Sequence, residues 1–124
     1  MSTSRYIRNF KAEAAIPAFT IVKNGTVDGN VLQATAIGDK LLGVSTDIAA
    51  AINERCDIIL AGPATILFGG PVARGDLLTS DATGRAVTAA PAAGVNNRII
   101  GIAMVSGVVG DIGQMIVSQG SAQG

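Results

Sequence analysis

Short apolar runs that alternate with turn-forming residues constrain the fold of this sequence more than any other feature. From Ile16 to Val117, runs of four to eight residues rich in Val, Ile, Leu and Thr are separated by Gly, Asn, Asp and Pro. Such runs are typical of β-strands, and the Gly and Asn residues between them supply the positive φ angles of tight hairpins. The sequence predicts a mostly β protein, with strands at 19–23, 31–37, 41–46, 57–61, 64–68, 77–80, 86–89, 99–105 and 114–118.

The β-rich part of the chain contains two similar halves. A shift of 58 positions aligns residues 40–44 (KLLGV) with residues 98–102 (RIIGI). We interpret this match as two half-repeats, about 14–62 and 69–120, while chance similarity in a chain rich in Gly, Ala and Ile is the alternative. The predicted architecture is a single β domain over 16–118, in which the two halves pack as a small β-barrel or sandwich.

Three segments depart from this strand pattern. Residues 1–15 are locally basic and are predicted to form an extended N-terminal arm. Residues 119–124 (QGSAQG) are predicted to be a flexible tail. The segment 47–54 is the one place for a short helix, with Asp47 as its N-cap, but it is short enough to be a loop instead.

Charge and composition exclude some classes of partner. Nine Lys and Arg residues balance nine Asp and Glu residues, so the chain has no excess positive charge to attract nucleic acid or an anionic membrane. The uncharged apolar stretch at 58–73 is interrupted by Pro and Gly and cannot span a bilayer as a helix. Hydrophobic residues make up 48% of the chain and charged residues only 15%, which predicts that the protein buries surface against further subunits.

The residue types needed for most catalytic and metal sites are scarce. The sequence has no histidine, the commonest general base and metal ligand, and its single cysteine, Cys56, suits a reducing compartment. Asp39, Asp76 and Asp111 each follow a glycine, and we interpret them as turn residues rather than as cation-binding or acid–base carboxylates. We therefore expect no enzymatic activity, no catalytic residues, no cofactor and no metal.

The N-terminal arm carries the candidate binding residues. Aromatic residues make up only 3% of the chain, yet two of the four lie in the first ten residues. Aromatic side chains that enter apolar pockets, with basic neighbours that meet an acidic surface, are typical of a protein–protein contact. A terminus that frays or docks on its own domain is the alternative. The residues predicted to contact a partner are Arg5, Tyr6, Ile7, Arg8, Phe10 and Lys11.

The order and spacing of several short motifs indicate a family. Over about residues 16–118 the chain resembles the small capsid decoration, or cement, proteins of tailed bacteriophages. The motifs that carry the resemblance are LLGVSTD at 41–47, DIILAG at 57–62, ARGDLL at 73–78, DATGRAV at 81–87 and IGIA at 100–103.

The resemblance implies a non-enzymatic virion protein that assembles as a homotrimer on the outer surface of the head. Such a protein would be assembled in the host cytoplasm, bind the major capsid protein and stabilise the expanded shell. In similar proteins a terminal arm often engages the shell or a neighbouring subunit, which would suit residues 1–15.

Other functions stay open from the residues alone. Another virion subunit, in the tail tube, the head-completion assembly or a fibre, is the main alternative. A small β-barrel that binds a glycan or another ligand would need aromatic residues in a pocket, and the body of the chain offers only Phe19 and Phe68. A minimal hydrolase that uses Asp or Ser would need a general base that the sequence does not reveal.

Overall fold

Residues 5–123 of the computed structural model are described, and they form nine β-strands and no helix. This confirms the predicted all-β fold class. No helix among these residues is long and apolar enough to cross a membrane. The strands are β1 (Tyr6–Ala12), β2 (Ile21–Asn24), β3 (Asn30–Gln33), β4 (Leu41–Ser45), β5 (Arg55–Leu67), β6 (Leu77–Ser80), β7 (Ala86–Thr88), β8 (Asn96–Ala103) and β9 (Ile112–Gln123).

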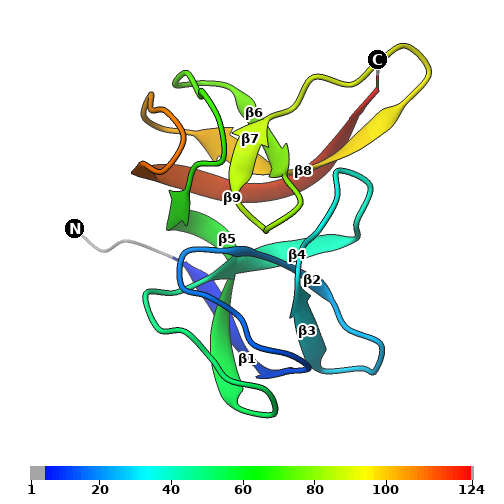
Figure 1. Ribbon diagram of the computed structural model, residues 1–124, viewed down its shortest axis with the longest axis vertical. Helices are drawn as coiled ribbons and strands as arrows, with labels where there is room; N and C mark the ends of the chain where they lie inside the picture. The colour runs from blue at the N-terminus through cyan, green and yellow to red at the C-terminus, as the bar shows by residue number, and fades with distance from the viewer. Residues whose placement is uncertain (1–4, 124) are drawn as a thin grey trace.

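The first half of the chain closes into a five-stranded barrel, the lower part of the molecule in Figure 1. Its strands follow the order β1-β3-β2-β4-β5, and an antiparallel pairing between β1 and β5 completes the ring. The β1–β3 pair is parallel, and the remaining pairs are antiparallel. Closure leaves no free sheet edge around this barrel.

The second half repeats the same arrangement in the upper part of the molecule. The order β3-β2-β4-β5 of the first half recurs as β7-β6-β8-β9, with antiparallel pairs throughout. A parallel bridge between Phe68 and Ala86 takes the place of the β1–β3 pair. The two predicted pseudo-repeated halves are therefore present, and the first begins at β1, earlier than residue 14.

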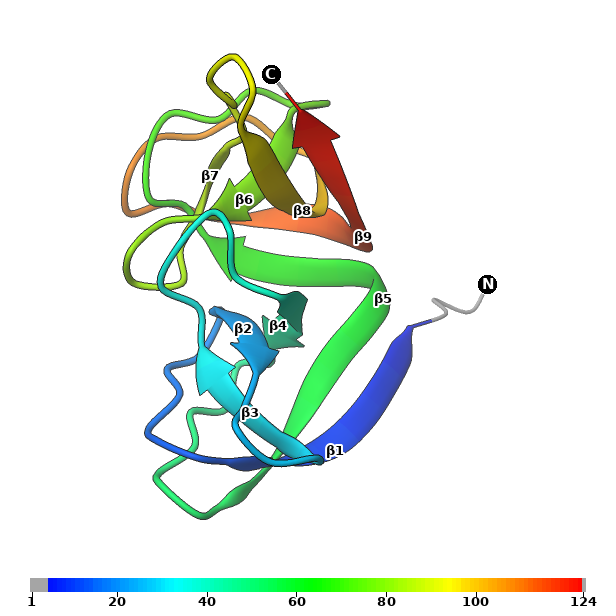
Figure 2. The ribbon, with the colours of Figure 1, turned by 90° about the vertical axis from the view of Figure 1, so that its right-hand side faces the viewer.

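Strand β5 belongs to both halves. Its first part pairs with β1 and β4, and from Gly62 onward it pairs with β9. Figure 2 shows β5 leaving the lower half and turning into the upper one. Gly62 has a φ of 94°, a conformation that glycine adopts without steric cost. The sequence predicted two strands here, because Gly62 and Pro63 separate the two apolar runs, and the structure joins them into one bent strand.

The core consists of two clusters of aliphatic side chains. The smaller one lies in the first half, and the larger one draws residues from both halves. Phe68 is fully buried in the larger cluster. The smaller cluster contains Ala12, Ile16, Val22, Val31, Ala50 and Ile58, and the larger includes Ile21, Val44, Ile59, Ile66, Phe68, Leu78, Ile100, Met115 and Val117.

Three predicted segments differ from the structure. Residues 6–12 of the predicted arm form β1, because pairing with β5 and β3 gives their backbone groups hydrogen-bond partners. Residues 119–123 of the predicted tail continue β9 and pair with β8. Residues 47–54 form turns and a bridge at Ala50 instead of a helix. Residues 1–4 of the predicted arm and residue 124 lie outside the described part.

Candidate interaction surface

The Gly-Asp motifs are turns that lead into strands, as the sequence predicted. The carboxylate of Asp39 accepts a hydrogen bond from the backbone N–H of Ala36, three residues earlier, at 3.0 Å. Asp76 and Asp111 accept the equivalent bonds at 2.9 and 3.0 Å. Each carboxylate thus satisfies a backbone donor of its own turn, which accounts for these residues structurally.

A fourth turn of this kind went unnoticed in the sequence because it contains neither Gly nor Asp. Glu54 accepts a hydrogen bond from the N–H of Ala51 at 2.7 Å, and Asn53 takes the positive φ, 70°, that glycine takes elsewhere. Asn is the residue other than Gly that most readily adopts this conformation. The signal available in the sequence was the position of Glu54, immediately before an apolar strand.

The tripeptide Arg74-Gly75-Asp76 is part of one of these turns. The carboxylate of Asp76 also accepts a hydrogen bond from the hydroxyl of Thr88 on β7, at 2.9 Å. This hydrogen bond holds the Asp76 side chain against β7, and Asp76 is only partly exposed.

Two aspartates have perturbed acidities. Partial burial raises the pKa of Asp39, but hydrogen bonds from Thr35 and Ala36 and the charge of Lys23, 3.5 Å away, outweigh it and lower the pKa overall. The pKa of Asp81 is likewise lowered: burial opposes the shift, and hydrogen bonds from Thr83 and Arg85 with the Arg85 charge produce it. Both carboxylates stabilise turns in their charged form.

Cys56 has the properties of a structural thiol. It is half-buried and packs against the smaller core cluster. Burial and the negative charge of Asp57 raise the pKa of Cys56, and they outweigh the opposing charge of Arg55. The thiolate, which is the reactive form of cysteine, is therefore disfavoured.

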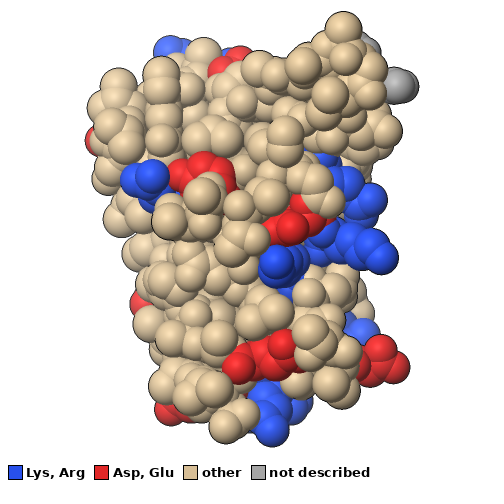
Figure 3. Space-filling model, turned by 45° about the vertical axis from the view of Figure 1, so that its right-hand side comes forward, with Lys and Arg blue, Asp and Glu red and all other residues tan. Residues whose placement is uncertain are grey.

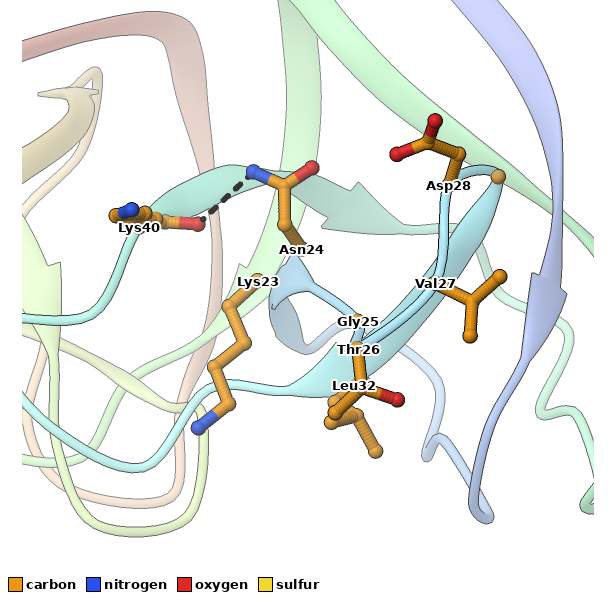
Figure 4. Close-up of a pocket in the computed structure, with 9 residues that line it drawn as sticks. Lys23, Asn24, Gly25, Thr26, Val27, Asp28, Leu32 and Lys40 are labelled. Carbon is orange, nitrogen blue, oxygen red and sulfur yellow. Dashed lines mark hydrogen bonds between the residues drawn. The ribbon is translucent and has the colours of Figure 1, made fainter.

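A wide groove of about 720 Å³ runs along the β2–β3 hairpin. Figure 4 shows the ammonium groups of Lys23 and Lys40 and the carboxylate of Asp28 pointing in different directions around it. Asn24 donates a long hydrogen bond of 3.5 Å to the Lys40 carbonyl. Catalytic and cofactor sites bring polar groups toward one point, and the groups that line this groove do not. Within residues 5–123, no three His, Cys, Asp or Glu side chains come together as a metal site.

The predicted partner-binding residues divide into two groups. Arg5, Tyr6, Ile7 and Arg8 are exposed, with 55% of Tyr6 accessible. Phe10 is instead half-buried and packs against the core of the first barrel, so less of it is accessible to a partner. The reason is the strand: residues of β1 alternate between the two faces of the sheet, and Phe10 lies on the inner one. Lys11, at the end of β1, is half-buried.

Arg5 lies between two shallow grooves, one on each half of the molecule. The groove on the first half measures about 600 Å³ and the one on the second about 530 Å³. Both contain Arg5 and Thr65. The first also includes Ile7, Phe19, Thr46, Asp47, Ile48 and Ile59, and the second Pro63, Ala64, Met104, Gln114, Met115 and Ile116.

Exposed aliphatic side chains in two corresponding loops were missed in the sequence, and one of them, Ile48, lines the first groove. Ile48 and Ile52 in the first half are 72% and 60% exposed. In the corresponding loop of the second half, Val108 and Val109 are each 59% exposed. No role was predicted for them from the sequence, and the structure shows that they face outward. We define the Arg5 surface as Arg5, Tyr6, Ile7, Arg8 and the two adjoining grooves.

Charge is unevenly distributed over the molecule. Residues 1–61 contain six basic and six acidic residues, whereas residues 62–124 contain only three of each. The three basic residues are Arg74, Arg85 and Arg98, and the three acidic ones are Asp76, Asp81 and Asp111. Figure 3 shows charged side chains of both signs around the middle and lower part of one face, while the upper part is largely uncharged. A weakly charged surface with exposed aliphatic residues is suited to contact with protein.

Comparisons with known proteins give a likeness of fold. No protein-family model matches the chain, and no curated protein sequence matches it. Among solved structures, the N base of the head fiber gp8.5 of bacteriophage phi29 is similar, with a TM-score of 0.65 and 15% sequence identity. The match covers 93% of this chain and 95% of that chain, so both halves share the fold of the phage protein.

Proposed function

We propose that this protein is a structural subunit of a bacteriophage head, attached to the outer surface of the shell through the major capsid protein. The observation that carries the proposal is the likeness in fold, over nearly the whole of both chains, to the base of a phage head fiber. The motif order at 41–103, which resembles the capsid decoration proteins, supports the same class of function.

A decoration role would act through binding equilibrium. A subunit that binds the expanded shell better than it binds the unexpanded or dissociated shell stabilises the expanded form by mass action. Many copies on one lattice also turn individually weak contacts into strong overall attachment. The interface of each copy therefore needs only modest affinity.

The Arg5 surface is the proposed contact with the shell. Arg5 and Arg8 are exposed cations, Tyr6 offers a large exposed amphipathic side chain, and Arg5 lines two shallow grooves that mix polar and apolar residues. An exposed aromatic residue flanked by arginines is a typical anchor in protein interfaces. The shell surface that it fits is acidic with apolar side chains.

A head-fibre base is the second candidate function. The phi29 match favours it, because the similar structure is the base of a head fiber. In this reading the protein would still attach to the shell and would also carry a fibre. Decoration of the whole head and attachment of fibres at chosen positions differ in where the protein sits on the virion.

The proposed function includes self-association and no catalysis. Self-association into a homotrimer is supported by the resemblance to decoration proteins and by the low charge content of the chain. The absence of catalysis is supported by the lack of histidine in the sequence and by the structural roles found for Asp39, Asp76 and Asp111.

Cosedimentation with expanded heads that lack the protein tests shell binding. Wild type should cosediment at a fixed ratio, and Arg5→Glu and Tyr6→Ala should weaken binding. Lys40→Glu, which changes an exposed cation on another part of the surface, is the matched control and should bind as wild type. Removal of residues 1–11 is unsuitable, because it would delete most of β1 and open the barrel. Wild type that stays in the supernatant contradicts the proposal.

Electron microscopy of labelled virions separates the two candidates. Label spread over the whole head would support decoration, whereas label confined to the attachment points of fibres would support a fibre base. Label on the tail alone would contradict both.

A further inference from the structure

The second half carries a row of exposed apolar residues that crosses four strands. Leu77 on β6 pairs with Ile102 on β8, Ile102 with Ile116 on β9, and Ile116 with Pro63 on β5. Paired residues in antiparallel strands present their side chains on the same face of the sheet. Leu77, Ile102 and Ile116 are 44%, 41% and 39% exposed. We call these four residues the outer row.

The first half has an equivalent row built from the same strand pairs. Ile21 on β2 pairs with Val44 on β4, Val44 with Ile59 on β5, and Ile59 with Ile7 on β1. Here Ile21 and Val44 are fully buried, and Ile59 is 2% exposed. Three of these four positions are thus buried in the first half, whereas Ile7 is 38% exposed, and all four equivalent positions are exposed in the second half.

The second half of the chain is what covers the row of the first half. The N–H of Leu67, at the end of β5, donates to the carbonyl of Phe19 at 3.0 Å. The N–H of Ile21 donates to the carbonyl of Gly84, in the β6–β7 turn, at 2.8 Å. The second part of β5 and the β6–β7 turn therefore lie over β2 and its neighbours.

The first half contains elements equivalent to the second part of β5 and the β6–β7 turn, but these elements do not pack over an apolar row of the same chain. The equivalent of the second part of β5 is β1, and the equivalent of the β6–β7 turn is the β2–β3 turn at 25–29. This turn exposes Val27 to 62% and lines the groove of Figure 4. Within the described residues, no segment packs over the outer row of the second half. At the other end of the molecule, β1 and the β2–β3 turn pack over no equivalent apolar row.

We infer that the outer row is an interface with a second copy of this chain, whose β1 and β2–β3 turn cover it as the second half covers the first. The contact is head-to-tail, because two different surfaces meet, and a contact of this type either closes into a ring or continues as a filament. The inference deepens the proposed self-association and rests on it. It adds which surfaces meet and in which orientation.

Variants on the two surfaces, measured by sedimentation velocity without capsids, test the interface. Wild type should be oligomeric. Ile102→Glu should weaken self-association by at least about 100-fold, because a carboxylate would be buried without a partner. Val27→Glu should do the same from the other side. Leu77→Lys repeats the test at a second position of the row, and circular dichroism verifies that each variant is folded. Val95→Glu, at a 41% exposed position outside both surfaces and outside the Arg5 surface, should associate as wild type.

Mixing the variants tests the head-to-tail orientation. An Ile102→Glu chain retains an intact turn, and a Val27→Glu chain retains an intact outer row, so an equimolar mixture should form dimers that neither variant forms alone. A mixture that stays monomeric would overturn the head-to-tail arrangement. If the Ile102→Glu variant is oligomeric, the outer row is not the interface, although the proposed self-association stands. If wild type is monomeric, both the interface and the self-association are contradicted. Pro63 and Ile116 of the outer row also line the second groove of the Arg5 surface, so the shell binding of each variant is measured separately.

Discussion

Gly43 on β4 and Gly101 on β8 occupy the same place in the two half-repeats, each against a backbone carbonyl of the next strand. A Cβ atom added at Gly43 would collide with the carbonyl oxygen of Ile59, and one added at Gly101 with that of Ile116. It would also lie 2.8 Å from Cγ2 of Ile58 in the first case and 2.6 Å from Cε of Met115 in the second. The glycine that aligned the two halves in the sequence is thus required by close approach of the strands.

Gly101→Ala is expected to destabilise the protein by about 1–3 kcal/mol, the usual cost of forcing an extra methyl group into a packed site. Gly43→Ala should have a similar effect. Thermal and urea unfolding measure the change. Gly38→Ala is the matched control, because a Cβ atom there meets nothing within 4 Å and should leave the stability nearly unchanged. Equal stability of Gly101→Ala and Gly38→Ala would contradict the close approach.

Phe68→Ala is expected to cost about 3–5 kcal/mol of unfolding free energy, the range for removing a large aromatic side chain from a core. Phe68 is fully buried, and its ring lies against Gly107 and Gly113. Urea unfolding monitored by circular dichroism measures the loss. Ile48→Ala, at a 72% exposed position, should change stability by less than about 0.5 kcal/mol. A loss for Phe68→Ala as small as that of the control would show that the ring does not fill the core.

The strands that the sequence predicted well are apolar runs bounded by turn residues. The prediction of 77–80 coincides with β6, and that of 41–46 exceeds β4 by one residue. In these segments a continuous apolar run ends at turn residues, so the pattern and the structure agree. The repeat was visible because Gly43 and Gly101 align within identical patterns of apolar residues.

Strand β1 was missed because nothing local identifies it. Its sequence, YIRNFKA, alternates polar and apolar residues only weakly and contains no continuous apolar run. Its inner residue Phe10 was assigned to partner binding for the same reason. The outer row could not be predicted either, because Leu77 and Ile21 look alike in sequence, and only the packing of the halves buries one and exposes the other.

The Cys56 thiol should react slowly with a thiol-specific reagent in the folded protein. Burial and the charge of Asp57 raise its pKa, so less thiolate is present at neutral pH than in a free cysteine. Reaction with an aromatic disulfide, followed by absorbance, should accelerate when urea unfolds the chain. Asp57→Asn should also accelerate it, because this change removes one cause of the raised pKa. Equal rates in folded and unfolded protein would contradict this account.

Stability should fall at acidic pH, because the charged forms of Asp39 and Asp81 are favoured in the folded protein. The pKa of each lies below its ordinary value of 3.8 when folded. The stabilisation is therefore complete above the unfolded-state pKa and is lost as the pH falls through the lower folded-state pKa, that is, below about pH 4. The midpoint of thermal unfolding, measured from pH 7 down to pH 2, should show this decline.

Asp81→Asn isolates one of these contributions. The carboxylate of Asp81 accepts hydrogen bonds from the backbone N–H groups of Thr83 and Arg85 and forms an ion pair with the Arg85 side chain at 2.9 Å. The amide of asparagine cannot replace the negative charge. The variant should be about 1–3 kcal/mol less stable than wild type at pH 7, in the range for hydrogen bonds to charged groups. Because wild type loses the same charge in acid, the difference should shrink below pH 4. Asp28→Asn, which changes an exposed turn carboxylate, should match wild type at both pH values. A difference between Asp81→Asn and wild type that stays constant with pH would assign the loss to altered packing rather than to charge.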